Sequence, residues 1–322
     1  MALASNSLTA LVVKRIALGL GLLLAISALI FAGTEMLPGD VAQSILGQSA
    51  TPEALANLRA DMGLNTPPLE RYLSWLGGIL QGDLGNSLSS GRDIGAMIGG
   101  RLGNTLFLAA TTAIIAVPLA VILGMVAVHF RNGIVDKLIS ITTITAISLP
   151  EFFIGYLLIL VFAVNFGWLP SSSLVYEGMS LGEKLTAIAL PCATLTLVVL
   201  AHMMRMTRAA ILNVMSSAYI ETAELKGISP FKIIFHHAFP NAISPIITVV
   251  VLNLAYLVVG VVIVEIIFVY PGMGQLLVDH VTKRDVPVVQ ATGLIFAAIY
   301  ILLNVFADVM SIIANPRLRH PK

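Results

Sequence analysis

Few residues in this chain have types and spacings that could do chemistry. No Walker A, HExxH, CxxC or GxSxG pattern occurs, which leaves no recognisable phosphate loop, zinc site, redox pair or nucleophile elbow. The adjacent His236 and His237 could suggest a metal pair, but neighbouring residues point to different faces of a helix. We therefore expect no catalytic residue and no metal ion or cofactor bound by this chain.

A second group of polar side chains lies within or beside apolar segments. A charge at the centre of a membrane helix costs about 2.5–3.5 kcal/mol on insertion scales, so such groups usually face protein or a water path. Glu151 follows Pro150 and is the best candidate for lining a path, with a helix–helix hydrogen bond at the kink as the alternative. Glu265 lies near a segment end, where exposure costs little. Asn304 and Asp308 are one turn apart, which favours a structural pair.

The composition shows what kind of scaffold must hold these side chains. Of the 322 residues, 57% are hydrophobic and only 11% are charged, and the mean hydropathy is +0.95. A soluble domain carries about 25% charged residues. The much lower fraction here indicates a membrane protein, most of which is surrounded by lipid. The net charge of +1 gives no sign of nucleic-acid binding, and the single Cys192 excludes an internal disulfide.

Six apolar runs approach the roughly 20 residues that a membrane-spanning helix needs. We therefore expect an all-α polytopic membrane protein with six transmembrane helices, the third of them interrupted at Pro150. The first run has 18 uncharged residues, too many for the roughly 7–15 of a signal peptide. The runs are Ile16–Gly33, Asn104–Val128, Leu138–Val164, Leu185–Met206, Ile243–Val269 and Val288–Ala314.

Lysine and arginine predict the orientation, since they are enriched in cytoplasmic loops. With the N-terminus inside, eleven of them fall on the inner side and seven on the outer side. This predicts a cytosolic N-terminus and first span in residues 1–33 and a periplasmic segment in residues 34–103. A five-helix core follows in residues 104–314, with a cytosolic coupling loop in residues 207–242, and then a cytosolic tail in residues 315–322.

The outer segment carries its own helix signals. Thr51, Pro52 and Glu53 read as an N-cap, a first-position proline and an acid in the first turn, so a helix to about Met62 is expected. The next stretch is amphipathic but too polar to span, which predicts a helix at the membrane surface. Its apolar face would be formed by Leu69, Tyr72, Leu73, Leu76 and Leu80.

The coupling loop is much longer than the usual 2–8 residues between helices. Gly227 is a natural helix stop, because the residue after a helix often takes a left-handed conformation. Ser229 and Pro230 then begin a second helix as N-cap and first residue. This helix should run to about Ala238, show Phe231, Ile234 and Phe235 on one face, and end at Pro240. A helix, a sharp bend and a short helix could transmit a mechanical movement to the spanning helices.

The spacing Glu221-x-Ala223, three residues, Gly227, then twelve residues to Pro240 resembles the EAA loop of bacterial ABC-importer permeases. That loop has the form E-A-A-x3-G-x9-I-x-L-P and is where such a permease binds its ATPase. Here Thr222, His237 and Phe239 replace the middle Ala, the Ile and the Leu. The resemblance implies ATPase docking and coupling by Glu221, Thr222, Ala223, Gly227, Ser229, Pro230, His237 and Pro240.

The resemblance covers nearly the whole chain, from about residue 10 to residue 319. Within the importers, the chain is similar to the first permease subunit of the dipeptide, oligopeptide and nickel group. The matching stretches are Leu37–Asp40, Met62–Leu88, Ser148–Gly155, Val264–Leu277, Arg284–Gln290 and Asn304–Arg319. The resemblance implies a second homologous permease, two cytosolic ATPase subunits that bind ATP and Mg, a periplasmic substrate-binding protein, and the bacterial inner membrane.

The expected function is that of a permease subunit in an ATP-driven, binding-protein-dependent importer for peptides or similar small solutes. An ion-gradient-driven secondary transporter is the alternative, but it would show repeated halves and midplane ion ligands. A membrane-embedded enzyme would need a catalytic constellation. The substrate stays open among dipeptide, oligopeptide, nickel chelate, glutathione and opine, as does the choice between a distinct partner permease and a second copy.

Overall fold

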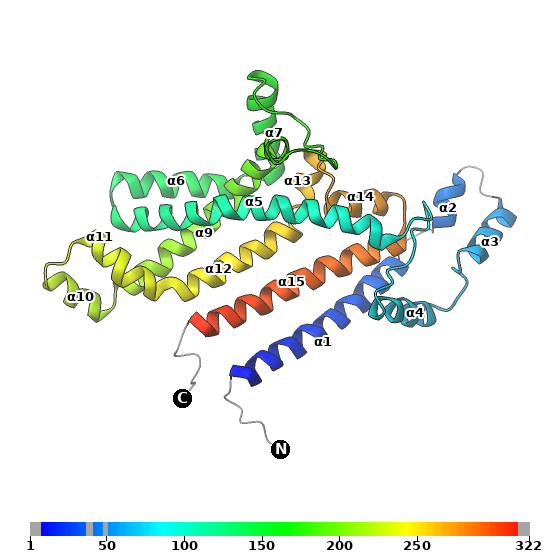
Figure 1. The fold of residues 1–322 in the computed structure, drawn as a ribbon, viewed down its shortest axis with the longest axis horizontal. Helices are drawn as coiled ribbons and strands as arrows, with labels where there is room; N and C mark the ends of the chain where they lie inside the picture. The colour runs from blue at the N-terminus through cyan, green and yellow to red at the C-terminus, as the bar shows by residue number, and fades with distance from the viewer. Residues whose placement is uncertain (1–7, 37–40, 48–50, 315–322) are drawn as a thin grey trace, which may run out of the picture.

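The computed structural model describes residues 8–36, 41–47 and 51–314, and within these ranges every regular element is a helix (Figure 1). The only strand-like pairing there is an isolated bridge between Asn86 and Asp93. The all-α prediction is therefore confirmed for this part of the chain. The family-like stretch Leu37–Asp40 and the predicted tail 315–322 lie outside the described residues.

Among the described residues, five helical segments are long and apolar enough to cross a membrane, and they match five of the six predicted spans. The sixth, the predicted third span, is bent by 103° between α6 (Ile134–Ser148) and α7 (Glu151–Leu158), which a π-helical segment, Ile159–Asn165, continues. Leu149 is extended there because a residue before proline avoids the helical region. The spanning helices are α1 (Leu8–Glu35), α5 (Ile94–His129), α9 (Ala189–Met215), α12 (Phe239–Val259) and α15 (Val286–Ala314).

The core lies where α5, α9 and α12 pack together, and its largest cluster also takes in Phe268 and Tyr270 beyond α12. Helix α15 packs against α12, and α1 lies along the outer side of α15 (Figure 1). Arg15 of α1 forms a 3.1 Å ion pair with Asp308 of α15. The predicted pairing of Asn304 with Asp308 is wrong: the Asn304 amide donates to the Tyr300 carbonyl, and Asp308 turns to α1.

The described part of the outer segment contains three short helices, α2 (Val41–Leu46), α3 (Pro52–Asp61) and α4 (Pro68–Leu80). The Thr51 side chain accepts a hydrogen bond from the Ala54 N–H, which confirms the predicted cap. Helix α4 packs on the end of α1 through an edge-on contact between Phe31 and Tyr72, whose hydroxyl also lies 2.9 Å from Ser27 Oγ.

Five further short helices join the spans. Helices α8 (Leu181–Ala187), α13 (Val262–Ile267) and α14 (Met273–Thr282) connect spans, as do α10 (Ala218–Leu225) and α11 (Pro230–Lys232) within the coupling loop. Ser180 and Glu183 form a capping box at the start of α8. Hydrogen bonds from the Ser180 backbone and hydroxyl hold the pKa of Glu183 below its usual range.

Candidate functional site

The bend in the coupling loop is a Schellman motif centred on Gly227. Helix α10 ends at Leu225, and Gly227 follows with φ of 74°. The Gly227 N–H donates to the Glu224 carbonyl at 2.8 Å and the Ile228 N–H to the Ala223 carbonyl at 3.2 Å, the two hydrogen bonds that define this motif. The predicted left-handed glycine stop is confirmed.

The three residues at the start of the EAA-like pattern point in different directions. Glu221 and Thr222 are exposed, and Ala223 is buried with only 7% of its surface accessible. Ala223 belongs to a cluster that takes in α5, α9 and α12 through Val128, Ile211 and Ile246. This cluster fixes α10 to three spanning helices, so the exposed side of the loop is held as part of a rigid body.

The second half of the loop begins as predicted but does not end as predicted. Ser229 occupies the N-cap position with extended backbone, although its side chain makes no capping hydrogen bond, and Pro230 is the first helical residue. The chain then passes through a π-helical segment, Ile233–Ala238, straight into α12. Pro240 therefore lies in the first turn of α12 instead of ending a helix. A proline lacks the N–H and crowds the preceding turn, and the wider π turn before it accommodates the ring.

The aromatic side chains of this segment form a ladder. Phe231 and Phe235 stack with ring centroids 5.5 Å apart, and Phe239 follows at 6.4 Å. Phe231 is 62% exposed and Phe235 45%, so they share a face as predicted, whereas the prediction that Ile234 lies on that face is wrong because Ile234 is buried. The spacing of four residues puts the aromatic rings on one side of the helix, and Ile234 packs into the cluster around Ala223.

His237 helps to hold the two halves of the loop together through its backbone. The Tyr219 hydroxyl of α10 donates to the His237 carbonyl at 3.2 Å, and the Asn241 side chain donates to the same oxygen at 2.7 Å. The half-buried His237 lies beside the exposed His236. The backbone of His237, more than its imidazole, connects α10 to the start of α12.

Glu151 lies at the start of α7, directly after the sharp bend. Its Oε2 accepts a hydrogen bond of 2.7 Å from the hydroxyl of Tyr256 on α12. A second polar contact of 3.2 Å joins His202 of α9 to Asn253, three residues before Tyr256. These contacts bring α7, α9 and α12 together through polar groups inside apolar segments, a grouping that only the tertiary structure reveals.

Two carboxylates at the opposite end, those of Glu265 and Asp285, are buried, which the sequence did not indicate. Glu265 is fully buried, contrary to the exposure expected for it, because its oxygens accept hydrogen bonds from Thr105 Oγ1 at 2.6 Å, Gly274 N at 2.7 Å and Gln275 N at 3.2 Å. It therefore caps the N-terminus of α14, where backbone N–H groups need acceptors. Thr105 and Glu265 are 160 residues apart, and no spacing in the sequence indicates that they form a hydrogen bond.

Asp285, before α15, is also fully buried. Its carboxylate accepts hydrogen bonds from the hydroxyls of Ser87 and Ser89, both at 2.6 Å, and from the Leu88 and Ser89 N–H groups, both at 3.1 Å. Ionised acceptors make hydrogen bonds roughly twice as strong as neutral ones. Asp285 thus connects the outer segment, at Ser87–Ser89, to the start of α15.

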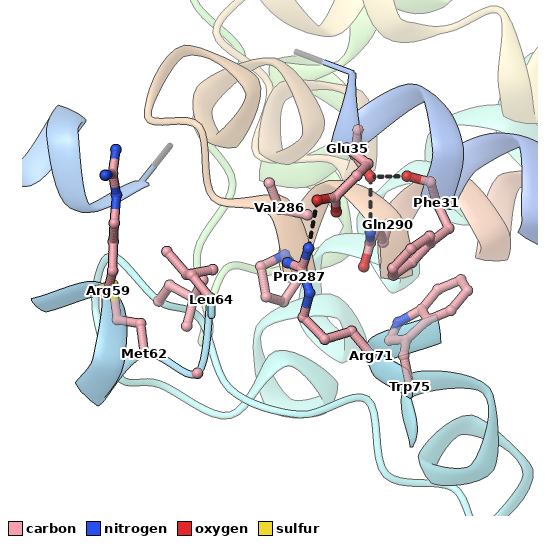
Figure 2. Close-up of a pocket in the computed structure, with 13 residues that line it drawn as sticks. Phe31, Glu35, Arg59, Met62, Leu64, Arg71, Trp75, Val286, Pro287 and Gln290 are labelled. Carbon is pink, nitrogen blue, oxygen red and sulfur yellow. Dashed lines mark hydrogen bonds and ion pairs between the residues drawn. The ribbon is translucent and has the colours of Figure 1, made fainter. Parts of the chain in front are cut away.

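A cavity of about 430 Å³ lies between the outer segment and the adjoining ends of α1 and α15 (Figure 2). Glu35 and Arg71 face each other across it as an ion pair. The Nε of Arg71 and the indole Nε1 of Trp75 are buried there without a hydrogen-bond partner among the described residues. Unsatisfied buried donors are rare in folded proteins.

Two family models match this chain. The model described as "Binding-protein-dependent transport system inner membrane component" covers residues 116–320, which include the coupling loop, Glu151 and Glu265. The model described as "Binding-prot-dependent transport system membrane comp, N-term" covers residues 8–97, which include α1 and most of the outer segment.

Curated relatives match over nearly the full length. A probable peptide ABC transporter permease protein of Sinorhizobium fredii is 33% identical over 96% of this chain and 99% of its own length. A putative peptide transport system permease protein of Brucella abortus is 35% identical over 97% of this chain and 100% of its own length. A glutathione transport system permease protein of Escherichia coli K12 is 36% identical over 96% of this chain and 98% of its own length.

Proposed function

The chain belongs to the family of binding-protein-dependent transport system inner membrane components, and we propose that it is the permease subunit of an importer for peptides or glutathione-like small solutes. Membership removes the ion-gradient-driven alternative and places the chain among membrane components that lack an ATPase domain. The relatives named for peptide and glutathione transport support the substrate class. ATP and Mg are bound by two separate ATPase subunits, and a second, homologous permease completes the membrane part.

The orientation proposed for this permease has both termini and the coupling loop in the cytoplasm and residues 34–103 in the periplasm. The Lys and Arg distribution supports it. The ion pair between Arg15 and Asp308 brings the beginning of α1 beside the end of α15, which agrees with both termini leaving the membrane on one side.

The observation that carries the proposal is the exposed aromatic ladder on a rigid bend in the coupling loop. Large apolar groups exposed together on a protein surface mark an interaction site. Phe231 and Phe235 offer such a surface, and Leu225 at the end of α10 is 83% exposed. We place the ATPase on this surface, with Glu221 and Thr222 beside it. Because the cluster around Ala223 connects the loop to α5, α9 and α12, movement of the ATPase would reach the spanning helices directly.

On the periplasmic side, the outer segment would receive the loaded binding protein. The cavity of about 430 Å³ between the outer segment and the ends of α1 and α15 supports this placement. Between the two sides, Glu151 would line the translocation path. The hydrogen bond from Tyr256 holds its carboxylate at the start of α7, and transport by Glu151 variants tests the assignment.

The test is purification of the tagged permease with its ATPase subunits after replacement of Phe231 and Phe235 by alanine. We expect loss of most co-purifying ATPase, because aromatic residues dominate the energetics of interfaces. Phe166 and Trp168 provide a matched control, since they also stack, at 4.6 Å, and are also exposed. Equal ATPase recovery from both double variants would refute the docking surface.

A further inference from the structure

One face of α9 is open between two neighbouring helices. His202 contacts Asn253 of α12 at 3.2 Å, and Arg208 makes a paired contact with Asp136 of α6, with Nε–Oδ1 at 3.0 Å and the second nitrogen–oxygen distance at 2.8 Å. Successive residues of an α-helix turn by about 100°, so Arg205 lies about 60° from each of these two. Arg205 therefore points between α6 and α12, and it is exposed there.

Arg205 is the unusual residue on this face. It lies toward the inner end of a spanning helix of 27 residues, and its side chain has no hydrogen bond or ion pair with any other described residue. An arginine near the end of a spanning helix faces protein or water, because exposure to lipid is costly. Its neighbours at this face include the exposed Met206, a flexible apolar side chain that adapts to different shapes.

An opposite charge lies further along the same side. Tyr256 is one turn beyond Asn253 on α12, and it holds Glu151 through Oε2. The other carboxylate oxygen of Glu151 accepts no hydrogen bond from a described residue. With about 1.5 Å of rise per residue, the step from Arg205 to His202 and the step from Asn253 to Tyr256 each add about 4.5 Å. Arg205 and Tyr256, the partner of Glu151, are thus about 9 Å apart along the helix axes.

We propose that Glu151 and Arg205 bind the two ends of a short zwitterionic peptide in transit, Glu151 the ammonium group and Arg205 the carboxylate. This inference rests on the proposed import of peptides. An extended peptide of two or three residues spans at most about 7–11 Å, which is comparable to this offset along the helix axes. The ends are the groups that all peptides share, so recognition there tolerates any side chain, and the carboxyl end leads toward the cytoplasm.

The experiment uses the complete importer in proteoliposomes with its own binding protein. An equimolar mixture of free di- and tripeptides is supplied, and mass spectrometry measures the uptake of each. Glu151→Gln and Arg205→Gln should each lower uptake about tenfold, the effect of losing one charge-assisted hydrogen bond. Because the binding protein is unchanged, the ratio of variant to wild-type uptake reports on the permease.

Controls separate charge recognition from folding. Glu151→Asp and Arg205→Lys keep the charges and should retain most of the uptake, whereas a role in packing would be disturbed by both. Asp279→Asn and Lys283→Gln remove charges away from this face and should leave uptake and complex yield unchanged.

The outcomes distinguish a failure of the proposed function from a failure of the inference about Glu151 and Arg205. If the wild-type importer accumulates no peptide with ATP, the proposed function fails. If the wild type imports peptides and the two glutamine variants do so equally well, only the inference about Glu151 and Arg205 fails. It also fails if Glu151→Asp and Arg205→Lys lose as much uptake as the neutral variants.

Discussion

Replacing Gly227 with valine tests whether the bend between α10 and α11 couples the ATPase to the spans. Gly227 has φ of 74°, and a Cβ built on it would meet nothing within 4 Å. The cost of a side chain is therefore confined to the backbone. The membrane spans should insert normally, because no contact with them is lost.

The size of the effect follows from the left-handed conformation. A non-glycine residue there costs about 1–2 kcal/mol, and a β-branched residue is the least tolerated. That range shifts the equilibrium between the bent loop and alternatives by a factor of about 5–30. A graded series is expected, with Gly227→Asn near wild type, Gly227→Ala intermediate and Gly227→Val most affected, because asparagine tolerates this conformation.

The assay is ATP hydrolysis by the reconstituted complex with and without its loaded binding protein, together with uptake. We expect stimulation and uptake to fall in the order of the series while the yield of permease stays constant. Gly182→Val is the control, since this helical glycine also has no neighbour within 4 Å and has no left-handed backbone. Wild-type stimulation and uptake in Gly227→Val would refute the role of the bend.

Three further predictions concern the outer side and the topology. Asp285→Asn should leave one of its N–H partners unsatisfied, at a cost of about 1–3 kcal/mol, and hydrogen exchange should rise around residues 87–89 but not in the coupling loop. Gly272→Ala would place a Cβ against the Glu265 carboxylate and should abolish the yield of folded permease; a normal yield would show that the α14 corner can shift. Single cysteines at the exposed Asn57 and Ser216, in a background without the native cysteine, should react with an impermeant thiol reagent in outer-membrane-permeabilised cells only at Asn57. Labelling at Ser216 alone would invert the orientation.

Local features were predictable because their causes lie within a few residues. The Thr51 cap and the left-handed stop at Gly227 follow from backbone hydrogen bonding at helix ends, which neighbouring residues satisfy. The five long spans follow from apolar length alone, because a bilayer of fixed thickness selects them. The ladder at Phe231, Phe235 and Phe239 was also predictable, since a spacing of four is helical, although the predicted face contained Ile234 and not Phe239.

Contacts between distant segments were decided only by the tertiary structure. The sequence predicted that Glu265 would be exposed near the end of an apolar segment. It is buried because α14 folds back, so that the first N–H groups of α14 donate to its carboxylate. The sequence predicted that a helix would end at Pro240. Instead, a π-helical segment leads directly into α12, which contains Pro240 in its first turn. The position of Arg205 between α6 and α12 depends on which helices α9 packs against. A sequence determines which groups need partners, and packing determines which partners they meet.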